Sequence, residues 1–270
     1  MFGGLDGFRL TVDGYRLAGV ILLYVGAGLV PALCIIRYGS NMTESLTPWY
    51  FVNLPVMDYG MVRDIQNRVV SGKIAGSIEK EVVIWAEHHP VFTLGRHGGK
   101  ENLMVSEDFL LKQKIPVCAS ERGGNITYHA PGQLIVYPIV DLQKVGLRVP
   151  EYVYHLEQIM IQTGQDFSVQ SGRNPAHPGI FTENGKLGSV GIAIRHGISF
   201  HGFALNVDID LEPFQWIHPC GLRDIKITSL YQETVFPLNL KVVRHSAQKH
   251  FCSLFGIEAV EVDFSELETI

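Results

Sequence analysis

Charge, paired cysteines and metal-binding signatures are all scarce in this chain of 270 residues. Only 18% of the residues are charged, and 22 Lys and Arg stand against 27 Asp and Glu, so the formal net charge is -5. That balance argues against a nucleic-acid-binding protein that works through bulk charge. The four cysteines, Cys34, Cys118, Cys220 and Cys252, are far apart and form no CxxC pair. We therefore expect free thiols, and neither a disulfide framework nor a cysteine zinc site.

The histidines also lack a metal-ligand pattern, because no H-E-x-x-H or H-x-x-x-H spacing occurs, and we expect no metal site. The 28 Gly and 13 Pro show no period, which excludes a collagen-like or coiled-coil protein. Hydrophobic residues make up 46% of the chain, enough for a sizeable core and too many for a disordered protein. The length fits one or two domains.

One long apolar run is present, at residues 17–36 (LAGVILLYVGAGLVPALCII). It carries no charge and is about as long as a membrane-spanning helix. Three interpretations stay open: a membrane anchor, a signal peptide, or translated upstream sequence with Met42 as the true start. We therefore treat residues 1–45 as an extension that differs in composition from the rest of the chain.

Beyond this extension, strand-like and helix-like segments alternate. Residues 49–54 and 81–86 are apolar or β-branched runs that predict strands. Asp58 is a candidate N-cap for a first long helix, and Pro150 can open a second. Gly256 stands where the cap of a final amphipathic helix is expected.

Two further segments indicate the type of sheet. Residues 134–142 predict a strong strand, but Pro138 interrupts it and favours an edge position or a bulge. Residues 186–194 and 198–207 are strand-like and are joined by Arg-His-Gly, which predicts a hairpin. Because hairpins mingle with helices, we expect an α/β (α+β) domain with a mixed, largely antiparallel sheet flanked by helices.

A glycine-rich segment, RGGNITYH, is the first candidate site. Paired glycines let a backbone approach a ligand closely and present its N–H groups. The segment is neither a dinucleotide fingerprint nor a P-loop, since G-x-G-x-x-G and G-K-[ST] are both missing from it. A plain glycine turn that leads into a strand explains the pattern equally well. The segment consists of Arg122, Gly123, Gly124, Asn125, Ile126, Thr127, Tyr128 and His129.

Two strand segments offer small residues beside polar ones. Lys186 is followed by Ser189, Val190 and Gly191, so its amine could point into a pocket or into solvent at a turn. The segment HGFALN contains Gly202, Phe203 and Ala204, and its small residues leave room for a ligand or for a packed helix. Spacing alone does not decide between these alternatives.

Cys220 lies between Pro219 and Gly221, a context that predicts a tight turn and not a core strand. A thiol becomes a good nucleophile when a neighbouring cation or base favours its thiolate. Lys186 and His218 are the candidates for that neighbour. Cys118 and Cys252 lie in apolar contexts and are expected in the core.

Taken together, these segments resemble one enzyme family. RGGNITYHAPGQLIVY at residues 122–137 closely resembles the signature of the octanoyl-[acyl-carrier-protein]:protein N-octanoyltransferases, the lipoate-protein ligase B family. HHPVFTLGR at residues 88–96, the segments that start at Lys186 and at His201, and Pro-Cys-Gly around Cys220 follow in the family's order. The resemblance runs from about residue 49 to about residue 255 and excludes the N-terminal extension.

The resemblance implies a biotin/lipoate protein ligase-like catalytic domain, which we place at residues 46–260, with a C-terminal tail at 261–270. It also implies a two-step acyl transfer without cofactor, in which Cys220 forms an octanoyl thioester and Lys186 assists the proton transfers. The substrate pocket is expected to form from the residues that match the family's binding segments: Arg122, Gly123, Gly124, Asn125, Ile126, Thr127, Tyr128, His129, Ser189, Val190, Gly191, Gly202, Phe203 and Ala204.

The partners implied by the resemblance are octanoyl-acyl carrier protein as donor and a lysine on a lipoyl domain as acceptor. The acceptor proteins would be 2-oxoacid dehydrogenases and the glycine cleavage H protein. We expect no nucleic acid, a cytoplasmic location, and membrane contact only through residues 17–36. The alternatives are an ATP-dependent lipoate or biotin ligase on the same fold, which would not need Cys220, and a non-catalytic acyl-binding protein.

Overall fold

The computed structural model of the chain describes residues 11–12, 15–16, 46–218, 225–234, 236 and 238–268. The chain divides into two units, Met1–Ser45 and Leu46–Ile270. In the first unit only the short strands β1 (Thr11–Val12) and β2 (Tyr15–Arg16) are described. The apolar run at residues 17–36 lies outside the described residues. Among the helices that are described, none combines the length and the apolar character needed to cross a membrane.

The second unit is built on an eight-stranded sheet with the strand order β13-β3-β4-β8-β12-β11-β10-β9. The pairs β13–β3 and β3–β4 are parallel, and the other pairs are antiparallel, as the sequence predicted. The bounds of the strands are β3 (Thr47–Met57), β4 (Val82–His88), β8 (Gln133–Asp141), β9 (Gly172–Asn174), β10 (His177–Phe181), β11 (Lys186–Arg195), β12 (Ile198–Asn206) and β13 (Ile257–Val262).

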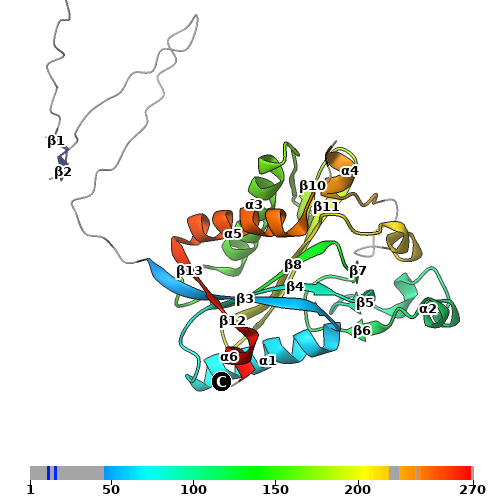
Figure 1. Cartoon of the computed structure of the whole chain (residues 1–270), viewed down its shortest axis with the longest axis horizontal. Coiled ribbons are helices and arrows are strands. Elements are labelled where there is room, and N and C mark those ends of the chain that lie inside the picture. Colours follow the sequence, from blue (N-terminus) through cyan, green and yellow to red (C-terminus); the bar gives the residue numbers. More distant parts are fainter. Residues whose placement is uncertain are drawn as a thin grey trace, which may run out of the picture. The chain divides into compact units, whose positions relative to one another are not determined.

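Helices cover both faces of this sheet (Figure 1). Helices α3 (Val149–Asp166) and α5 (Leu240–Phe255) lie on one face, and α1 (Tyr59–Ala75) lies on the other. Three shorter helices, α2 (Glu107–Gln113), α4 (Leu230–Glu233) and α6 (Phe264–Glu268), complete the unit. The mixed fold class that the sequence predicted is therefore confirmed.

The helix ends follow the local signals. Asp58 is the N-cap residue of α1, although its side chain makes no capping hydrogen bond. Pro150 lies in the first turn of α3. Gly256 ends α5 in the left-handed conformation, which glycine adopts at little steric cost.

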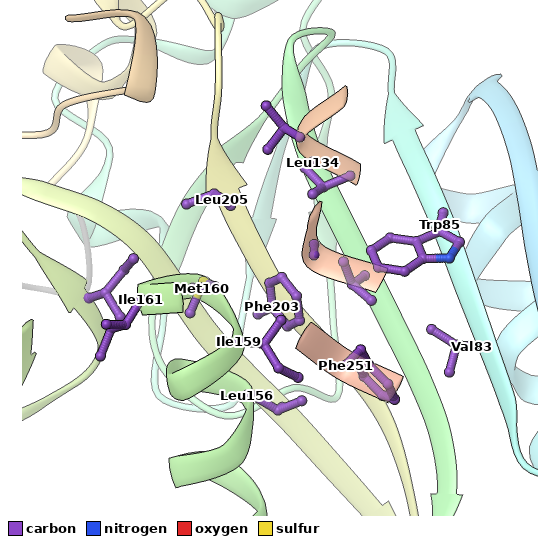
Figure 2. Packing of buried hydrophobic residues seen from close by; sticks show 14 of the residues in the cluster. Val83, Trp85, Leu134, Leu156, Ile159, Met160, Ile161, Phe203, Leu205 and Phe251 are labelled. Carbon is purple, nitrogen blue, oxygen red and sulfur yellow. The ribbon is translucent and has the colours of Figure 1, made fainter. Parts of the chain in front are cut away.

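The core on the α3 and α5 face is continuous from helix to sheet (Figure 2). Leu156, Ile159 and Met160 of α3 and Phe251 of α5 are fully buried against residues of β4, β8 and β12. The first three follow the three-to-four-residue spacing of one helix face, and this amphipathic stripe is what fixes α3 on the sheet. Phe203 of β12 lies in the same cluster.

A smaller sheet carries the glycine-rich segment. Its strands β6 (Val117–Ala119), β5 (Val91–Leu94) and β7 (Ile126–His129) lie side by side in that order, beside α2 (Figure 1). Two 3-10 helices, η1 (Lys100–Asn102) and η2 (Glu212–Trp216), are also present, and η2 contacts β7.

The position of Pro138 corrects a prediction. The strand that contains it, β8, lies between β4 and β12 and not at an edge, and no register shift marks a bulge there. The missing N–H is accommodated on the β12 side, where the ladder is interrupted between the pairs Ser199–Val140 and Phe203–Val136. In the continued register His201 would stand opposite Pro138, and its N–H donates instead to Gln66 Oε1 of α1 at 2.8 Å.

The sheet also continues past residue 260. Strand β13 pairs with β3 through Val262, so the sheet includes the first two residues of the segment expected as a C-terminal tail.

Candidate functional site

The glycine-rich segment lies against the sheet at β11. The Gly123 N–H donates to the Ile192 carbonyl at 2.8 Å, so the loop between β6 and β7 follows the edge of β11. Arg122, which is 9% exposed, connects the loop to β5. Its guanidinium donates to the Thr93 carbonyl at 2.6 Å and to Thr93 Oγ1 at 2.8 Å. The glycine-rich segment is therefore not a plain turn between β6 and β7, because it is hydrogen-bonded to both β11 and β5.

A cavity lies between this loop and the middle of β11 and β12. The structure brings most of the predicted pocket residues to its wall, from three segments far apart in the sequence. They are Arg122, Gly123, Gly124, Asn125, Ile126, Thr127, His129, Lys186, Ser189, Val190, Gly191, Gly202, Phe203 and Ala204. Sequence reasoning missed four further lining residues: Tyr59, Ile135, Tyr137 and His201. Three of these are part of the quoted motifs or strands, whereas Tyr59 at the start of α1 gave no signal.

Tyr128 is not among the lining residues. Side chains alternate along a strand, so Tyr128 faces away from Thr127 and His129. Its ring packs against Phe92 and Phe214, with ring centroids 5.2 and 5.5 Å away. We therefore leave Tyr128 out of the site.

Lys186 is buried at the start of β11, with 2% of its surface exposed. Its Nζ donates to the Pro178 carbonyl at 3.1 Å and lies 5.3 Å from the centre of the Phe181 ring. Its backbone is fixed by a parallel bridge to Ile227, where the Thr228 N–H donates to the Lys186 carbonyl at 3.0 Å. The structure thus places the amine in the wall of the cavity and not in solvent.

Cys220 lies outside the described residues, as does the rest of 219–224. The chain on either side of this segment is described. The His218 N–H donates to the Asn102 carbonyl at 2.8 Å, and the Asn102 amide donates to Asn125 Oδ1 of the glycine-rich segment at 3.0 Å. On the other side, Ile227 pairs with Lys186. Both ends of the segment that contains Cys220 are therefore tied to residues of the cavity wall or to their direct contacts.

His129 is held by a chain of buried hydrogen bonds. Its Nδ1 lies 2.7 Å from Gln133 Oε1, and its Nε2 lies 3.3 Å from Thr93 Oγ1. The Gln133 amide donates to Asn206 Oδ1 at 2.8 Å, which fixes Oε1 as the acceptor for Nδ1–H. Nε2 then accepts from the hydroxyl. Burial, the neighbouring His88 and Arg122 keep the pKa of His129 well below 6.5, so the ring is neutral.

The chain continues from Asn206, whose amide donates to the Thr228 carbonyl at 2.9 Å. Since the Thr228 N–H binds the Lys186 carbonyl, the glycine-rich segment and Lys186 are connected through buried polar groups. This arrangement assigns His129 to the cavity wall, with both ring nitrogens engaged in holding it.

Two other histidines lie near the cavity: His201 lines it, and the His88 ring packs against the lining residues His129 and Tyr137. Burial lowers the pKa of His88 to about 4, and its Nε2 accepts from the Tyr137 hydroxyl at 2.7 Å. Burial likewise lowers the pKa of His201 to about 4, although Glu121, 3.6 Å away, opposes that shift. Neutral rings and aliphatic side chains therefore form much of the wall, and such a wall suits an uncharged, apolar ligand.

A second cavity adjoins the first. It shares Gly123, Gly124 and Lys186 with the first cavity and is also lined by Val153 of α3 and Ile192 of β11. Lys186 therefore lies where two spaces meet, which suits a reaction that joins two substrates.

A model of the lipoyl protein ligase A/B catalytic domain matches residues 58–252 of the chain. An octanoyltransferase of Desulfotalea psychrophila is 44% identical over 209 residues, which are 77% of this chain and 94% of that protein. An octanoyltransferase of Syntrophotalea carbinolica is 41% identical over 202 residues, 75% of this chain and 92% of that protein. The chain belongs to the octanoyltransferases of the lipoyl protein ligase A/B family. The family and the enzyme class predicted from the sequence are thereby confirmed.

The structural comparison supports the fold of this octanoyltransferase. A lipoate-protein ligase A, solved with ATP bound, superposes with a TM-score of 0.62 at 16% identity, over 83% of this chain and 92% of that chain. The enzyme is an acyltransferase that transfers octanoyl groups in lipoate biosynthesis.

Proposed function

We propose that this octanoyltransferase works through a thioester on Cys220, with Lys186 as the general acid and base. The donor is octanoyl-acyl carrier protein, and the acceptor is the ε-amine of a lysine on a lipoyl domain. The observation that carries the proposal is Lys186: a lysine that is 2% exposed, at the junction of two cavities, and bridged to the chain that follows Cys220.

In the first step the Cys220 thiolate attacks the thioester carbonyl of the donor. A new carbon–sulfur bond forms, the bond to the phosphopantetheine sulfur breaks, and this thiol leaves with a proton. In the second step the acceptor amine attacks the Cys220 thioester, an amide forms, and the Cys220 sulfur leaves. In the first step Lys186 takes the proton of the Cys220 thiol and returns it to the leaving phosphopantetheine sulfur. In the second step it takes a proton from the attacking amine and returns it to the Cys220 sulfur.

This chemistry needs no ATP. Exchange of one thioester for another is nearly isoenergetic, and the second step converts a thioester into a more stable amide. The cavity supplies binding energy in place of a cofactor. At about 0.8 kcal/mol for each buried methylene, seven carbons of the acyl chain contribute roughly 5 kcal/mol before ordering costs. The space that the acyl chain would fill is lined by His129, Ala204, Gly191 of β11 and Gly202 of β12.

The test is a mass-spectrometric one. The full chain is incubated with octanoyl-acyl carrier protein, and intact and peptide masses are recorded beside Cys220→Ser and Lys186→Ala. We expect an octanoyl adduct on Cys220 that hydroxylamine removes and that a lipoyl domain discharges. Cys220→Ser should form no thioester. Lys186→Ala should form the thioester at least about 100-fold more slowly, since general acid–base groups contribute roughly 100- to 10,000-fold to the rate.

Two outcomes would overturn the proposal. Modification of the lipoyl domain that depends on ATP and persists in Cys220→Ser would indicate a ligase on the same fold. Octanoyl-acyl carrier protein that binds without any adduct or product would indicate an acyl-binding protein.

A further inference from the structure

A buried carboxylate on α3 contacts the strand that faces Lys186. Glu157 is 7% exposed, and its Oε1 accepts a hydrogen bond of 2.8 Å from the Gly179 N–H. The carbonyl of the same peptide unit belongs to Pro178 and accepts the 3.1 Å hydrogen bond from Lys186 Nζ. One peptide unit therefore connects Glu157 with Lys186.

The backbone around this peptide unit departs from regular strand geometry. Gly179 has a φ of 128°, a value that L side chains rarely adopt, and a Cβ at this position would collide with the Gly188 carbonyl oxygen. The register of β10 shifts between His177 and Ile180 against β9, and again beyond Ile180 against β11. Such irregularities re-aim backbone groups beside active sites. Here the irregular strand turns the Pro178 carbonyl toward Lys186.

The other side of Glu157 is also fixed. Its Oε2 lies 3.1 Å from Arg173 Nε. The Arg173 guanidinium in turn donates to the Tyr154 carbonyl and to Gln158 Oε1, and it lies 3.6 Å above the Tyr154 ring. Both carboxylate oxygens of Glu157 therefore have partners, and the carboxylate has little freedom to turn away from Gly179.

We infer that Glu157 is a positioning residue for Lys186, acting through the Pro178–Gly179 peptide. The inference rests on the proposed role of Lys186. A carboxylate that accepts the peptide N–H polarises the peptide, and the carbonyl becomes a stronger acceptor for the lysine N–H. The amine is thereby held at one place in the cavity wall, and a misplacement of 1 Å costs an enzyme about 100-fold in rate.

Three variants separate positioning from plain structural support. Glu157→Met keeps the length of the side chain but accepts no hydrogen bond. Glu157→Gln keeps a neutral oxygen that can accept from Gly179. Gln158→Ala is the matched control. Gln158 lies next to Glu157 on α3 and also binds Arg173, but it makes no hydrogen bond to the Pro178–Gly179 peptide.

Octanoyl transfer from octanoyl-acyl carrier protein to a lipoyl domain is measured with each full-length variant, together with the melting temperature. We expect kcat to fall about 30- to 100-fold in Glu157→Met and about 3- to 10-fold in Glu157→Gln. The KM for the donor should change less than threefold, because Glu157 does not line the cavity. Gln158→Ala should keep the parental kcat.

A Glu157→Met protein that melts earlier but turns over like Gln158→Ala would overturn the inference. If Glu157→Met does not fold, Glu157→Gln decides, since a kcat equal to the parent's would also overturn it. Lys186→Ala is measured in parallel. Full activity of Lys186→Ala would reject the proposed function itself, whereas an inactive Lys186→Ala beside unaffected Glu157 variants would reject the positioning role alone.

Discussion

At the scale of single residues, Gly202 shapes both the sheet and the cavity. A side chain there would collide with the Val136 carbonyl oxygen and would come within 2.6 Å of Pro138 Cδ. The absence of a side chain lets β12 approach β8 closely beside the proline. The neighbouring His201 has a φ of 56° and lies with its ring against Tyr137, with ring centroids 6.1 Å apart. Glycine and proline together thus bring a histidine into the cavity wall.

We predict that Gly202→Ala lowers the free energy of unfolding by about 1–3 kcal/mol, the usual cost of overpacking. It should also lower kcat/KM for octanoyl transfer, because β12 must move at the cavity. Urea unfolding and steady-state kinetics measure the two effects. Gly60→Ala is the control, since no atom lies within 4 Å of a Cβ there and alanine favours the helix. Equal behaviour of the two variants would contradict the prediction.

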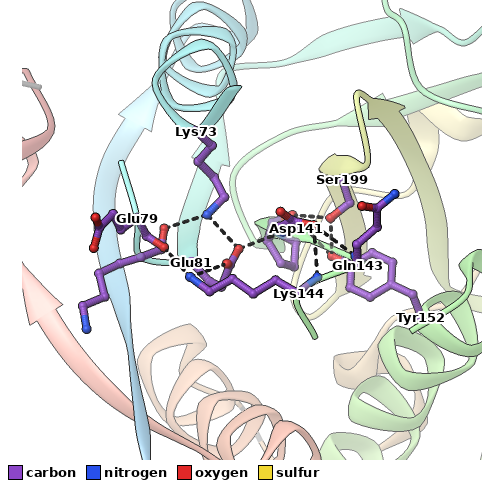
Figure 3. A network of polar contacts seen from close by, with 10 residues as sticks. Lys73, Glu79, Glu81, Asp141, Gln143, Lys144, Tyr152 and Ser199 are labelled. Atoms are coloured by element: carbon purple, nitrogen blue, oxygen red, sulfur yellow. Dashed lines mark hydrogen bonds and ion pairs between the residues drawn. The ribbon is translucent and has the colours of Figure 1, made fainter. Parts of the chain in front are cut away.

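At the scale of elements, a buried ion pair connects α1, the start of β4 and the end of β8 (Figure 3). Glu81 immediately precedes β4, and its Oε2 lies 2.9 Å from Lys73 Nζ of α1. The same oxygen accepts the Asp141 N–H at the end of β8 at 2.8 Å. Lys144 Nζ lies 3.8 Å from Oε1. Since the Glu81 and Lys73 side chains are 3% and 4% exposed, water does not replace these partners.

Glu81→Gln should therefore destabilise the fold by about 3–5 kcal/mol, because it leaves the Lys73 ammonium buried without its counter-charge. Equilibrium urea unfolding measures this. Glu79→Gln, two residues earlier and exposed, should change stability by less than about 0.5 kcal/mol. A double variant, Glu81→Leu with Lys73→Met, should recover much of the loss, since an apolar pair carries no desolvation penalty. A single variant as stable as the parent would show that the pair contributes nothing.

At the scale of the whole molecule, buried histidines make stability depend on pH. His88, His129 and His201 are 0%, 6% and 1% exposed, and burial lowers the pKa of each ring. The folded protein therefore stays unprotonated at these rings where the unfolded chain, with a histidine pKa near 6.5, already binds protons. The unfolded state then binds more protons, and stability rises with pH.

The free energy of unfolding should accordingly fall as the pH drops from 6.5 toward about 4. A pKa lowered from 6.5 to about 4 corresponds to roughly 3 kcal/mol for one histidine. His201→Gln should flatten the slope by about 1.4 kcal/mol per pH unit near pH 5. It is compared with His245→Gln, the same substitution at an exposed histidine. Urea unfolding at several pH values between 4 and 7 measures the slopes. A slope unchanged in His201→Gln would show that this ring titrates normally.

Much of the architecture followed from local patterns. The β-branched run before residue 86 is β4, the pattern after Asp58 is α1, and the Arg-His-Gly turn joins β11 to β12. Period-2 and period-3.6 patterns report burial on one face, and burial is what these elements share. The pattern failed at Pro138, because a single sequence does not show that the facing strand can break its own ladder at His201.

The site divides in the same way. The sequence by itself determined the family and predicted the chemistry-bearing residues, because ordered motifs such as RGGNITYH and the Lys186 segment carry that information without geometry. Only the tertiary structure decided that Tyr128 faces the core and that Tyr59 reaches the cavity. It alone connects Glu157 to Lys186, since that link runs through a backbone peptide from a third element. Contacts made by main-chain groups leave no trace in side-chain identity, and they exist only once the strands have found their neighbours.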